Sequence, residues 1–337
     1  MPSFLIVRLG ALGDIVHALP LAAALRARYP EARIDWVVDE RYAELLDLVP
    51  IIDRRIVLGT KSLSPLRRIV ELYRTLARES YDVAIDVQGL LKSAVVARLS
   101  RARRVLGFPL PHLREAAAYF FYSETHQPGP SGHVIEKNLM LAAVLGADTF
   151  PIRFPLKVPH SAALDAVHAT GVSADGRSFA ILNPGASWPN KRWPPERFGA
   201  VGQWLNRELG LRSVVTWGIG ERALAAAVVA ESAGSAELAP ATSIADLAAI
   251  VREAELVISG DTAPAHLAAA LGTPVVGLYG PTDIIRNGPW AQHDFSVSRF
   301  AACGCHYRRR CRIRQWCLGD IRVADVTDAI GRRFHGS

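Results

Sequence analysis

Three polar residues, Asp261, Thr262 and His266, lie in an otherwise apolar stretch, residues 255–283. An apolar run precedes them and Pro264 suits the first position of a helix, so they fall where a strand gives way to a helix. The unsatisfied N–H groups and the positive dipole end of a helix N-terminus favour a phosphate there. The alternative is that Asp261 or Thr262 only caps the helix and that His266 is satisfied locally.

Another acidic residue follows an apolar run at the start of the chain. Phe4–Leu9 predicts a strand, and a turn with Gly10 and Gly13 leads to Asp14 and a helix expected at Ile15–Arg28. The pattern G-x-x-G-D differs from the dinucleotide-binding G-x-G-x-x-G, so the glycines alone identify no cofactor. Asp14 is therefore either a helix N-cap or a group that acts on a ligand at the edge of the sheet.

Two charged residues follow predicted strands in the second half of the chain. Lys191 comes after a strand at Ala180–Leu182 and before a helix begun by proline, a suitable place for a phosphate. Glu221 follows a strand at Ser213–Trp217, where it could accept from a ribose hydroxyl. The alternatives are a solvated loop lysine and a glutamate that complements a helix dipole.

An alternation of strands and helices through the whole chain positions these residues. It predicts an α/β protein with doubly wound parallel sheets, and prolines and glycines in residues 150–176 indicate a boundary between two domains. Residues 109–132 are aromatic and expected to be irregular. Further strands are expected at Ile34–Val38, Arg55–Leu58, Tyr81–Val87, Val105–Phe108, Leu256–Ser259 and Val275–Tyr279, and helices at Gly132–Leu145, Ser243–Arg252 and Val323–Phe334.

The composition describes a globular, basic protein. Half of its 337 residues are hydrophobic and its formal charge is +7, which favours anionic partners. We find no nucleic-acid-binding motif, secretory signal or membrane-spanning run, and we expect a cytoplasmic protein. A basic amphipathic helix at residues 66–78 either packs on its sheet or rests on a membrane surface.

The four cysteines of the chain, Cys303, Cys305, Cys311 and Cys317, all lie in one C-terminal segment. Such clustering could bind a metal ion, but the spacing is not that of two C-x-x-C pairs. Disulfides are uncommon in the cytosol. The sequence alone leaves metal binding by this segment open.

Several motifs together resemble glycosyltransferase family 9, the ADP-heptose:lipopolysaccharide heptosyltransferases. The family motif D-T-x-x-x-H is matched at residues 261–266, followed by Y-G-P-T at residues 279–282. The family's G-D-x-x-H-x-x-P is matched at residues 13–20, and its K-x-W-P at residues 191–194. Ala263 stands where the family usually has glycine, and a small residue there still lets a ligand approach.

The resemblance implies a GT-B fold of two Rossmann-like domains with a cleft between them. Residues 1–160 would bind the acceptor and residues 161–337 the nucleotide sugar, and the last helix could pack back on the N-terminal domain. The implied reaction is an inverting transfer of L-glycero-D-manno-heptose from ADP-heptose to Kdo-lipid A, in lipopolysaccharide inner-core synthesis. No cofactor and no catalytic metal are implied, and attachment to the inner face of the inner membrane is an open alternative.

The resemblance also assigns roles to residues. Asp14 would be the general base, and Lys191 would contact the donor diphosphate. The other residues expected at the donor are Ala186, Ser187, Glu221, Thr242, Asp261, Thr262, Ala263 and His266, and those expected at the acceptor are Gly13, His17, Lys61 and Lys92.

The sequence does not fix the identity of the acceptor, and it leaves two alternative functions to be weighed. Residues 86–94, DVQGLLKSA, resemble the enzymes that add the first heptose, whereas the cysteine-rich tail resembles the heptosyltransferase II type, which adds a later one. A Rossmann oxidoreductase is disfavoured because the chain lacks G-x-G-x-x-G and a ribose-binding acid after the first strand. A non-catalytic sugar-nucleotide binder is disfavoured by the presence of Asp14, Lys191 and Asp261.

Overall fold

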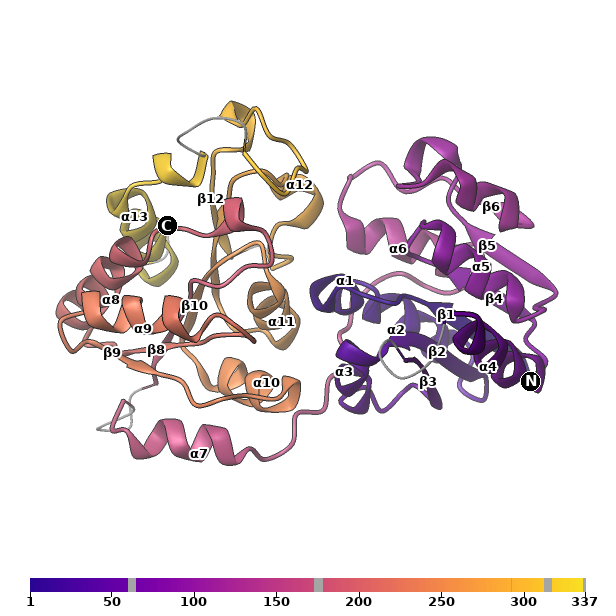
Figure 1. Ribbon diagram of the computed structural model, residues 1–337, viewed down its shortest axis with the longest axis horizontal. Coiled ribbons are helices and arrows are strands. Elements are labelled where there is room, and N and C mark those ends of the chain that lie inside the picture. Colours follow the sequence, from indigo (N-terminus) through magenta and orange to yellow (C-terminus); the bar gives the residue numbers. More distant parts are fainter. Residues whose placement is uncertain (60–64, 173–177, 292, 312–316, 336–337) are drawn as a thin grey trace. The chain divides into compact units, whose positions relative to one another are not determined.

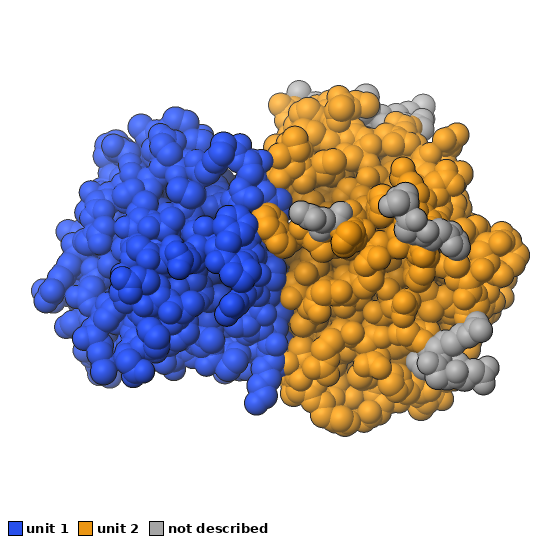
Figure 2. Space-filling view, turned by 180° about the vertical axis from the view of Figure 1, so that it is seen from behind, with its two compact units in different colours: residues 1–157 blue, residues 158–337 orange. Residues whose placement is uncertain are grey.

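The computed structural model describes residues 1–59, 65–172, 178–291, 293–311 and 317–335. The chain divides into two compact units, Met1–Lys157 and Val158–Ser337, which Figure 2 shows in different colours. Each unit contains one six-stranded parallel sheet with helices packed on it (Figure 1). This confirms the predicted α/β class with two doubly wound, Rossmann-like units.

The sheet of the first unit has the strand order β3-β2-β1-β4-β5-β6. The direction of winding reverses between β1 and β4, which is the strand order of dinucleotide-binding Rossmann folds. Neighbouring strands are in parallel register, with Val7 of β1 opposite Val37 of β2 and Asp86 of β4. The strands are β1 (Ser3–Val7), β2 (Arg33–Asp39), β3 (Arg54–Leu58), β4 (Val83–Asp86), β5 (Arg104–Gly107) and β6 (Glu124–Thr125).

Helices cover the first sheet through apolar side chains. Leu72 and Leu76 of α4 and Val96 of α5 join Val7 and Val37 in one buried cluster, whereas α2 packs on α6. The helices are α1 (Leu12–Val16), α2 (Leu19–Arg28), α3 (Ala43–Asp47), α4 (Pro65–Ala77), α5 (Leu91–Leu99) and α6 (Val134–Ala143).

The second sheet repeats the winding of the first, with the order β12-β11-β10-β7-β8-β9. Its reversal lies between β7 and β10, where Leu182 is opposite Ile258. The strands are β7 (Ala180–Asn183), β8 (Ser213–Val215), β9 (Ala236–Leu238), β10 (Leu256–Gly260), β11 (Val275–Tyr279) and β12 (Phe295–Ser298).

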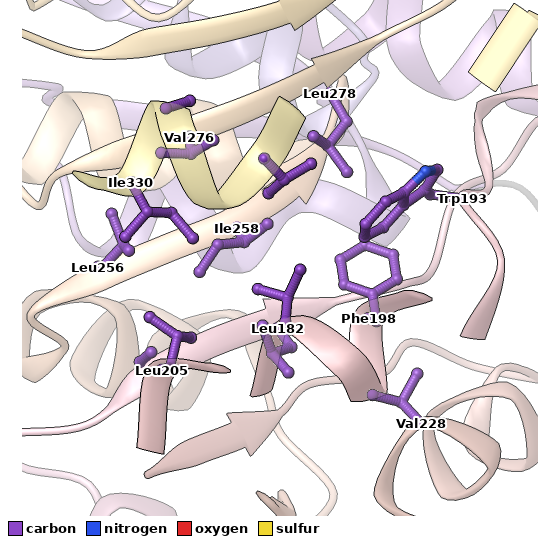
Figure 3. Packing of buried hydrophobic residues seen from close by; sticks show 14 of the residues in the cluster. Leu182, Trp193, Phe198, Leu205, Val228, Leu256, Ile258, Val276, Leu278 and Ile330 are labelled. Carbon is purple, nitrogen blue, oxygen red and sulfur yellow. The ribbon is translucent and has the colours of Figure 1, made fainter. Parts of the chain in front are cut away.

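Alternate side chains of the second sheet enter two different cores, as the period of a strand requires. Leu182 and Ile258 belong to the core under α8, α9 and α13, together with Phe198 and Ile330 (Figure 3). Ile181 belongs to the opposite core, under α7, α10 and α11. The helices are α7 (Ala162–Ala169), α8 (Pro195–Leu209), α9 (Arg222–Glu231), α10 (Ile244–Glu253), α11 (Ala263–Leu271), α12 (Ile284–Asn287) and α13 (Val323–His335).

The last helix, α13, uses its apolar face inside the second unit. Val326, Ala329 and Ile330 are buried in the core that it shares with α8. These contacts lie within the second unit, and packing of this helix on the N-terminal domain stays a prediction.

The structure differs from the predicted elements where local signals are weak. The single helix expected at Ile15–Arg28 is two helices, α1 and α2, with Pro20 in the first turn of α2. A proline lacks the N–H that a continuous helix would need at that position. The short strands β6, β9 and β12 were not predicted, and residues 109–132 contain two short 3-10 helices and β6 instead of being wholly irregular. None of the described helices is long and apolar enough to cross a membrane.

Asp294, just before β12, gives the second unit a pH-dependent stability. Burial raises the pKa of its carboxyl to about 6 from the ordinary 3.8, opposed by the Val275 N–H and the charge of Arg333. Its Oδ1 accepts from the Val275 N–H at 2.8 Å, and its Oδ2 is buried without a partner among the described residues. Because the folded state binds this proton more tightly than the unfolded state, this contribution to stability falls as pH rises from about 4 to about 6.

We expect Asp294→Asn to remove that pH dependence, because an amide does not titrate. The difference in free energy of unfolding between wild type and variant should change by about 1–2 kcal/mol between pH 4 and pH 7, allowing for solvent screening. Chemical denaturation at both pH values measures it, and the amide's unpaired N–H adds only a constant offset. A difference that is the same at the two pH values would contradict the assignment.

Candidate active site

The predicted polar residues lie at the point of each sheet where the winding reverses. Asp14 follows β1 in the first unit, whereas Lys191 follows β7 and Asp261 follows β10 in the second. In open α/β sheets, ligands bind beyond the carboxyl ends of the strands at this point. The topology therefore places the candidate residues at the ligand-binding edge of their own sheets.

Asp261 is the centre of a buried polar network. Its Oδ2 accepts from Lys191 Nζ at 2.6 Å, and its Oδ1 lies 2.9 Å from His266 Nε2. The side chain of Asp261 is 3% exposed and that of His266 is 7% exposed. The structure thus brings together three predicted donor residues, with both carboxylate oxygens of Asp261 committed to protein partners.

Burial alone would raise the pKa of the Asp261 carboxyl, but its partners outweigh burial. The hydrogen bond with His266 and the charge of Lys191 lower its pKa well below the ordinary range. Asp261 is therefore an anion at any physiological pH. Its carboxylate holds Lys191 and His266 in place, and its expected contact with the donor stays a prediction.

The helix that follows, α11, begins with half-buried residues. Its N-cap is Thr262, whose side chain makes no capping hydrogen bond. The Thr262 hydroxyl instead lies 2.9 Å from Ser259 Oγ and accepts from Asn183 Nδ2 at 3.1 Å. Thr262 thus occupies the N-cap position, as the capping alternative expected, but without a side-chain capping hydrogen bond. Pro264 at the second helical position leaves the N–H groups of Thr262 and Ala263 as the donors at this end.

Two asparagines complete the network, and the sequence analysis missed both. Asn183, the last residue of β7, donates to Ser259 Oγ at 3.1 Å and accepts from Thr216 Oγ1 at 3.2 Å. It joins the carboxyl ends of three neighbouring strands, and its position beside a proline and a glycine was the signal for it. Asn287 Nδ2 lies 3.5 Å from Asp261 Oδ2, and no local pattern marks it.

Lys191 is held in place by the motif that contains it. Trp193, two residues later, is 1% exposed, packs edge-on against Phe198 at 5.0 Å and donates from Nε1 to the Ile321 carbonyl at 3.0 Å. On the other side, Gly260 approaches so closely that a Cβ there would lie 2.9 Å from the Lys191 carbonyl oxygen. The tryptophan is thus a core anchor, and Gly260 has no room for a side chain.

Glu221 and Ala186 form a second group of contacts in this unit. Glu221 Oε1 accepts from Arg192 Nη2 at 3.2 Å, and Arg192 Nε donates to the Ala186 carbonyl at 2.9 Å. The carboxylate lies so close to Gly185 that a Cβ there would be 2.1 Å from Glu221 Oε2. Arg192 therefore ties Glu221 to the loop that leads to Lys191.

The remaining predicted donor residues are less tightly held. Ser187 is exposed, whereas Thr242 and Ala263 are half-buried. Thr242 immediately precedes Ser243, the N-cap of α10. Their location beyond the strands is compatible with a ligand at this edge of the sheet.

In the first unit, Asp14 is paired with a buried arginine. Its Oδ2 lies 2.7 Å from Arg8 Nη2 and accepts from the Ala11 N–H at 3.1 Å. The N-cap of α1 is Ala11, and Asp14 is the third helical residue. Asp14 is thus not the N-cap itself, although its carboxylate does satisfy the N-cap N–H. Its side chain is 29% exposed, against 8% for that of Arg8.

The predicted acceptor residues have mixed environments. Gly13 is buried in α1, and His17 at the end of α1 is 5% exposed, with its ring 5.9 Å from that of His133. Lys92, in the first turn of α5, is exposed. Lys61 lies outside the described residues.

The four cysteines form no disulfide and pack in one cluster. Cys305 Sγ lies 3.0 Å from Cys311 Sγ, and burial together with Cys303 raises the pKa of the Cys317 thiol to about 12. Across the described part of the chain, no three Cys, His, Asp or Glu side chains are arranged to hold a metal ion. Cys317 also approaches the chain at Gly280, where a Cβ would lie 2.8 Å from its Sγ.

Comparison with known proteins points to one family. The model of glycosyltransferase family 9 (heptosyltransferase) matches residues 69–317. Lipopolysaccharide heptosyltransferase 1 of Escherichia coli K12 is 29% identical over 288 residues, 83% of this chain and 88% of that protein. An Escherichia coli lipopolysaccharide heptosyltransferase 3 is 28% identical over 291 residues, 83% of this chain and 84% of that protein.

A solved structure agrees with these matches. The Escherichia coli heptosyltransferase WaaC with ADP-2-deoxy-2-fluoro heptose has a TM-score of 0.76 at 25% identity, covering 98% of this chain and 99% of that one. The chain therefore has the GT-B fold that the motifs implied.

The buried pair of Lys191 and Asp261 should contribute to stability. Lys191→Met removes the cation but keeps most of the apolar stem, leaving the Asp261 carboxylate buried with fewer partners. We expect the free energy of unfolding to fall by about 1–3 kcal/mol, as measured by chemical denaturation.

A matched control separates this pair from an ordinary ion pair. Arg207 and Glu208 pair at 2.6 Å on the surface, with side chains 68% and 47% exposed. Arg207→Met should cost less than about 0.5 kcal/mol. Equal losses in the two variants would show that the Lys191–Asp261 pair is only a surface-like contact.

Proposed function

The chain belongs to glycosyltransferase family 9, and on that premise we propose that it transfers heptose from ADP-heptose to Kdo-lipid A with inversion at the anomeric carbon. The first unit would bind the acceptor and the second the nucleotide sugar. The boundary that we propose is the one expected from the sequence, near residue 160.

The arrangement of Lys191 beside the N-terminus of α11 is the observation that carries this proposal. A helix N-terminus without a side-chain cap and a lysine fixed next to it form a site for a diphosphate. A related protein, WaaC, has been solved with an ADP-heptose analogue, which supports the same class of donor here.

Lys191 can serve Asp261 and the donor at once. A lysine ammonium carries three N–H donors. Lys191 Nζ contacts Asp261 Oδ2 at 2.6 Å and the Asp261 carbonyl at 3.4 Å, and it lies 4.6 Å from the centre of the Trp188 ring. Its third N–H would turn to a phosphate oxygen of the donor. Fixed donors aimed at the charge that develops on the leaving diphosphate lower the barrier without acid–base chemistry.

Asp14 would be the general base of the reaction. It would take the proton of an acceptor hydroxyl, whose oxygen forms the new bond to the anomeric carbon as the bond to ADP breaks. The proton ends on Asp14 and the electron pair of the broken bond leaves with ADP. Ala186, Ser187, Glu221 and Thr242 would line the nucleotide, and Gly13, His17, Lys61 and Lys92 would meet the acceptor.

The position of transfer on the lipopolysaccharide core has a second candidate. The chain is 28% identical to a heptosyltransferase 3 and 29% identical to a heptosyltransferase 1, so the two similarities are nearly equal. An acceptor that already carries heptose is therefore the alternative. Because either acceptor is a lipid, we propose that the protein works at the inner face of the inner membrane. Its formal charge of +7 would favour an anionic surface.

Donor and acceptor can be tested together. ADP should raise the melting temperature by binding the folded state, whereas NAD should not. With ADP-heptose, we expect transfer to Kdo-lipid A, and no transfer to an acceptor that already carries the first heptose. Transfer only to the heptosylated acceptor would favour the later enzyme type, and stabilisation by NAD alone would overturn the proposal.

Asp14→Asn tests the assignment of the base. The amide keeps the shape of the side chain but cannot take the proton, so single-turnover transfer should fall by about a hundredfold to ten-thousandfold. Stabilisation by ADP should stay close to that of wild type. Asp165→Asn is a matched control, because Asp165 also lies in a first helical turn, that of α7, and is 59% exposed. Wild-type rates in Asp14→Asn would remove Asp14 from the chemistry.

A further inference from the structure

Arg8 is a charged side chain buried at the end of β1 in the first unit. It directly follows β1 and is only 6% exposed. Burying a guanidinium is costly unless its N–H groups are paired, and apolar residues of similar volume often serve stability as well or better. Arg8 Nε is buried without a hydrogen-bond partner among the described residues, so the site is not arranged for the best stability of this side chain.

The two terminal nitrogens of Arg8 connect the first turn of α1 with the loop after β4. Nη2 lies 2.7 Å from Asp14 Oδ2, and Nη1 donates to the Val87 carbonyl at 2.9 Å. Val87 directly follows β4, the strand on the other side of the reversal point. The planar guanidinium therefore fixes Asp14 relative to the end of β4.

The backbone of Arg8 is fixed as firmly as its side chain. Its N–H donates to the Val37 carbonyl at 3.3 Å, and its carbonyl accepts from Trp36 Nε1 at 3.1 Å. The next residue, Leu9, donates its N–H to Gln88 Oε1 at 2.8 Å. Arg8 is thus held by β2 on one side and by the loop after β4 on the other.

We propose that Arg8 is a positioning residue for Asp14, an inference that rests on the proposed role of Asp14 as general base. Arg8 and the Ala11 N–H both hold Oδ2, which fixes the orientation of the carboxylate. The carboxylate held in this orientation then takes the proton of the acceptor hydroxyl. With its side chain 8% exposed against 29% for Asp14, Arg8 acts through Asp14 and not on the substrate.

The geometry also explains the choice of arginine over lysine at this position. The guanidinium presents a rigid fork of N–H groups, whereas an ammonium is a single point of charge on a flexible stem. A lysine could reach either Asp14 or the Val87 carbonyl but would hold the carboxylate less rigidly. Arg8→Lys should therefore recover only part of the effect of the arginine.

The experiment measures single-turnover heptose transfer in Arg8→Met, Arg8→Lys, Asp14→Asn and the double variant Arg8→Met/Asp14→Asn. Misplacing a reacting group by about 1 Å costs on the order of a hundredfold, so Arg8→Met should be about tenfold to a hundredfold slower, with Arg8→Lys in between. The increase in melting temperature caused by ADP should be the same in Arg8→Met and Arg8→Lys as in wild type. In the Asp14→Asn background, Arg8→Met should lower the rate by less than about threefold, because no base is left to position.

Arg26→Met is the matched control for loss of an arginine. Arg26 also donates to backbone carbonyls, at Ile51 and Ala32, and pairs with Asp53 at 2.6 Å in the same unit. We expect it to lower the melting temperature but to leave the transfer rate within about twofold of wild type, since no reacting group depends on it.

The outcomes separate the two proposals. An equal loss from Arg8→Met with and without Asp14 would make Arg8 merely structural and overturn the inference, as would an Arg8→Met enzyme with the wild-type rate. Wild-type transfer by Asp14→Asn would instead overturn the role of Asp14 itself. Should Arg8→Met not fold, Arg8→Lys takes its place. Partial activity in Arg8→Lys, together with a small difference in transfer rate between Asp14→Asn and Arg8→Lys/Asp14→Asn, supports the inference. A large difference in transfer rate between the last two contradicts it.

Discussion

A carboxylate buried as deeply as that of Asp261 is stable only if nearby groups replace the water it has lost. Lys191 and His266 do so, one on each oxygen. This pairing accounts for how the loop that carries Lys191 is held in the second unit. Lys191 must be brought to within 2.6 Å, so its loop is anchored by Trp193 in the core and pressed against Gly260. The lysine that we propose to contact the donor diphosphate is thus held in place by a buried anion.

The same topology serves two different chemical tasks in the two units. Each sheet reverses its winding between its first and fourth strands, and in each the loops after those strands carry the polar residues. In the first unit the outcome is an exposed anion held by a buried cation, Asp14 by Arg8. In the second unit the charges are reversed: Lys191, which is 14% exposed, is held by the anion of Asp261, which is 3% exposed. The fold thus puts a charged residue at the ligand-binding edge of each sheet. The sign of the buried partner determines whether that residue is an anion, as in the first unit, or a cation, as in the second.

The sequence was informative where a residue's role depends on its neighbours along the chain. The strand–turn–helix pattern around Asp261 predicted a strand end and a helix start, and both are present as β10 and α11. Roles that depend on contacts across the sheet could not be predicted in this way. Nothing local indicates that Asn287 reaches Asp261, or that Arg8, six residues before Asp14, turns back to meet it. The short edge strands were missed because two to four residues carry too little periodicity to be distinguished from a loop.

Every contact described for the two charge networks closes within its own unit. Arg8 and Asp14 are joined to residues of the first 157 positions, and Lys191, Asp261 and His266 to residues beyond them. On the division of roles that we propose, each charge network belongs to the unit whose ligand it would serve. A first unit that recognises one acceptor could then be exchanged for one that recognises another, while the pairing of Lys191 with Asp261 is carried by the second unit.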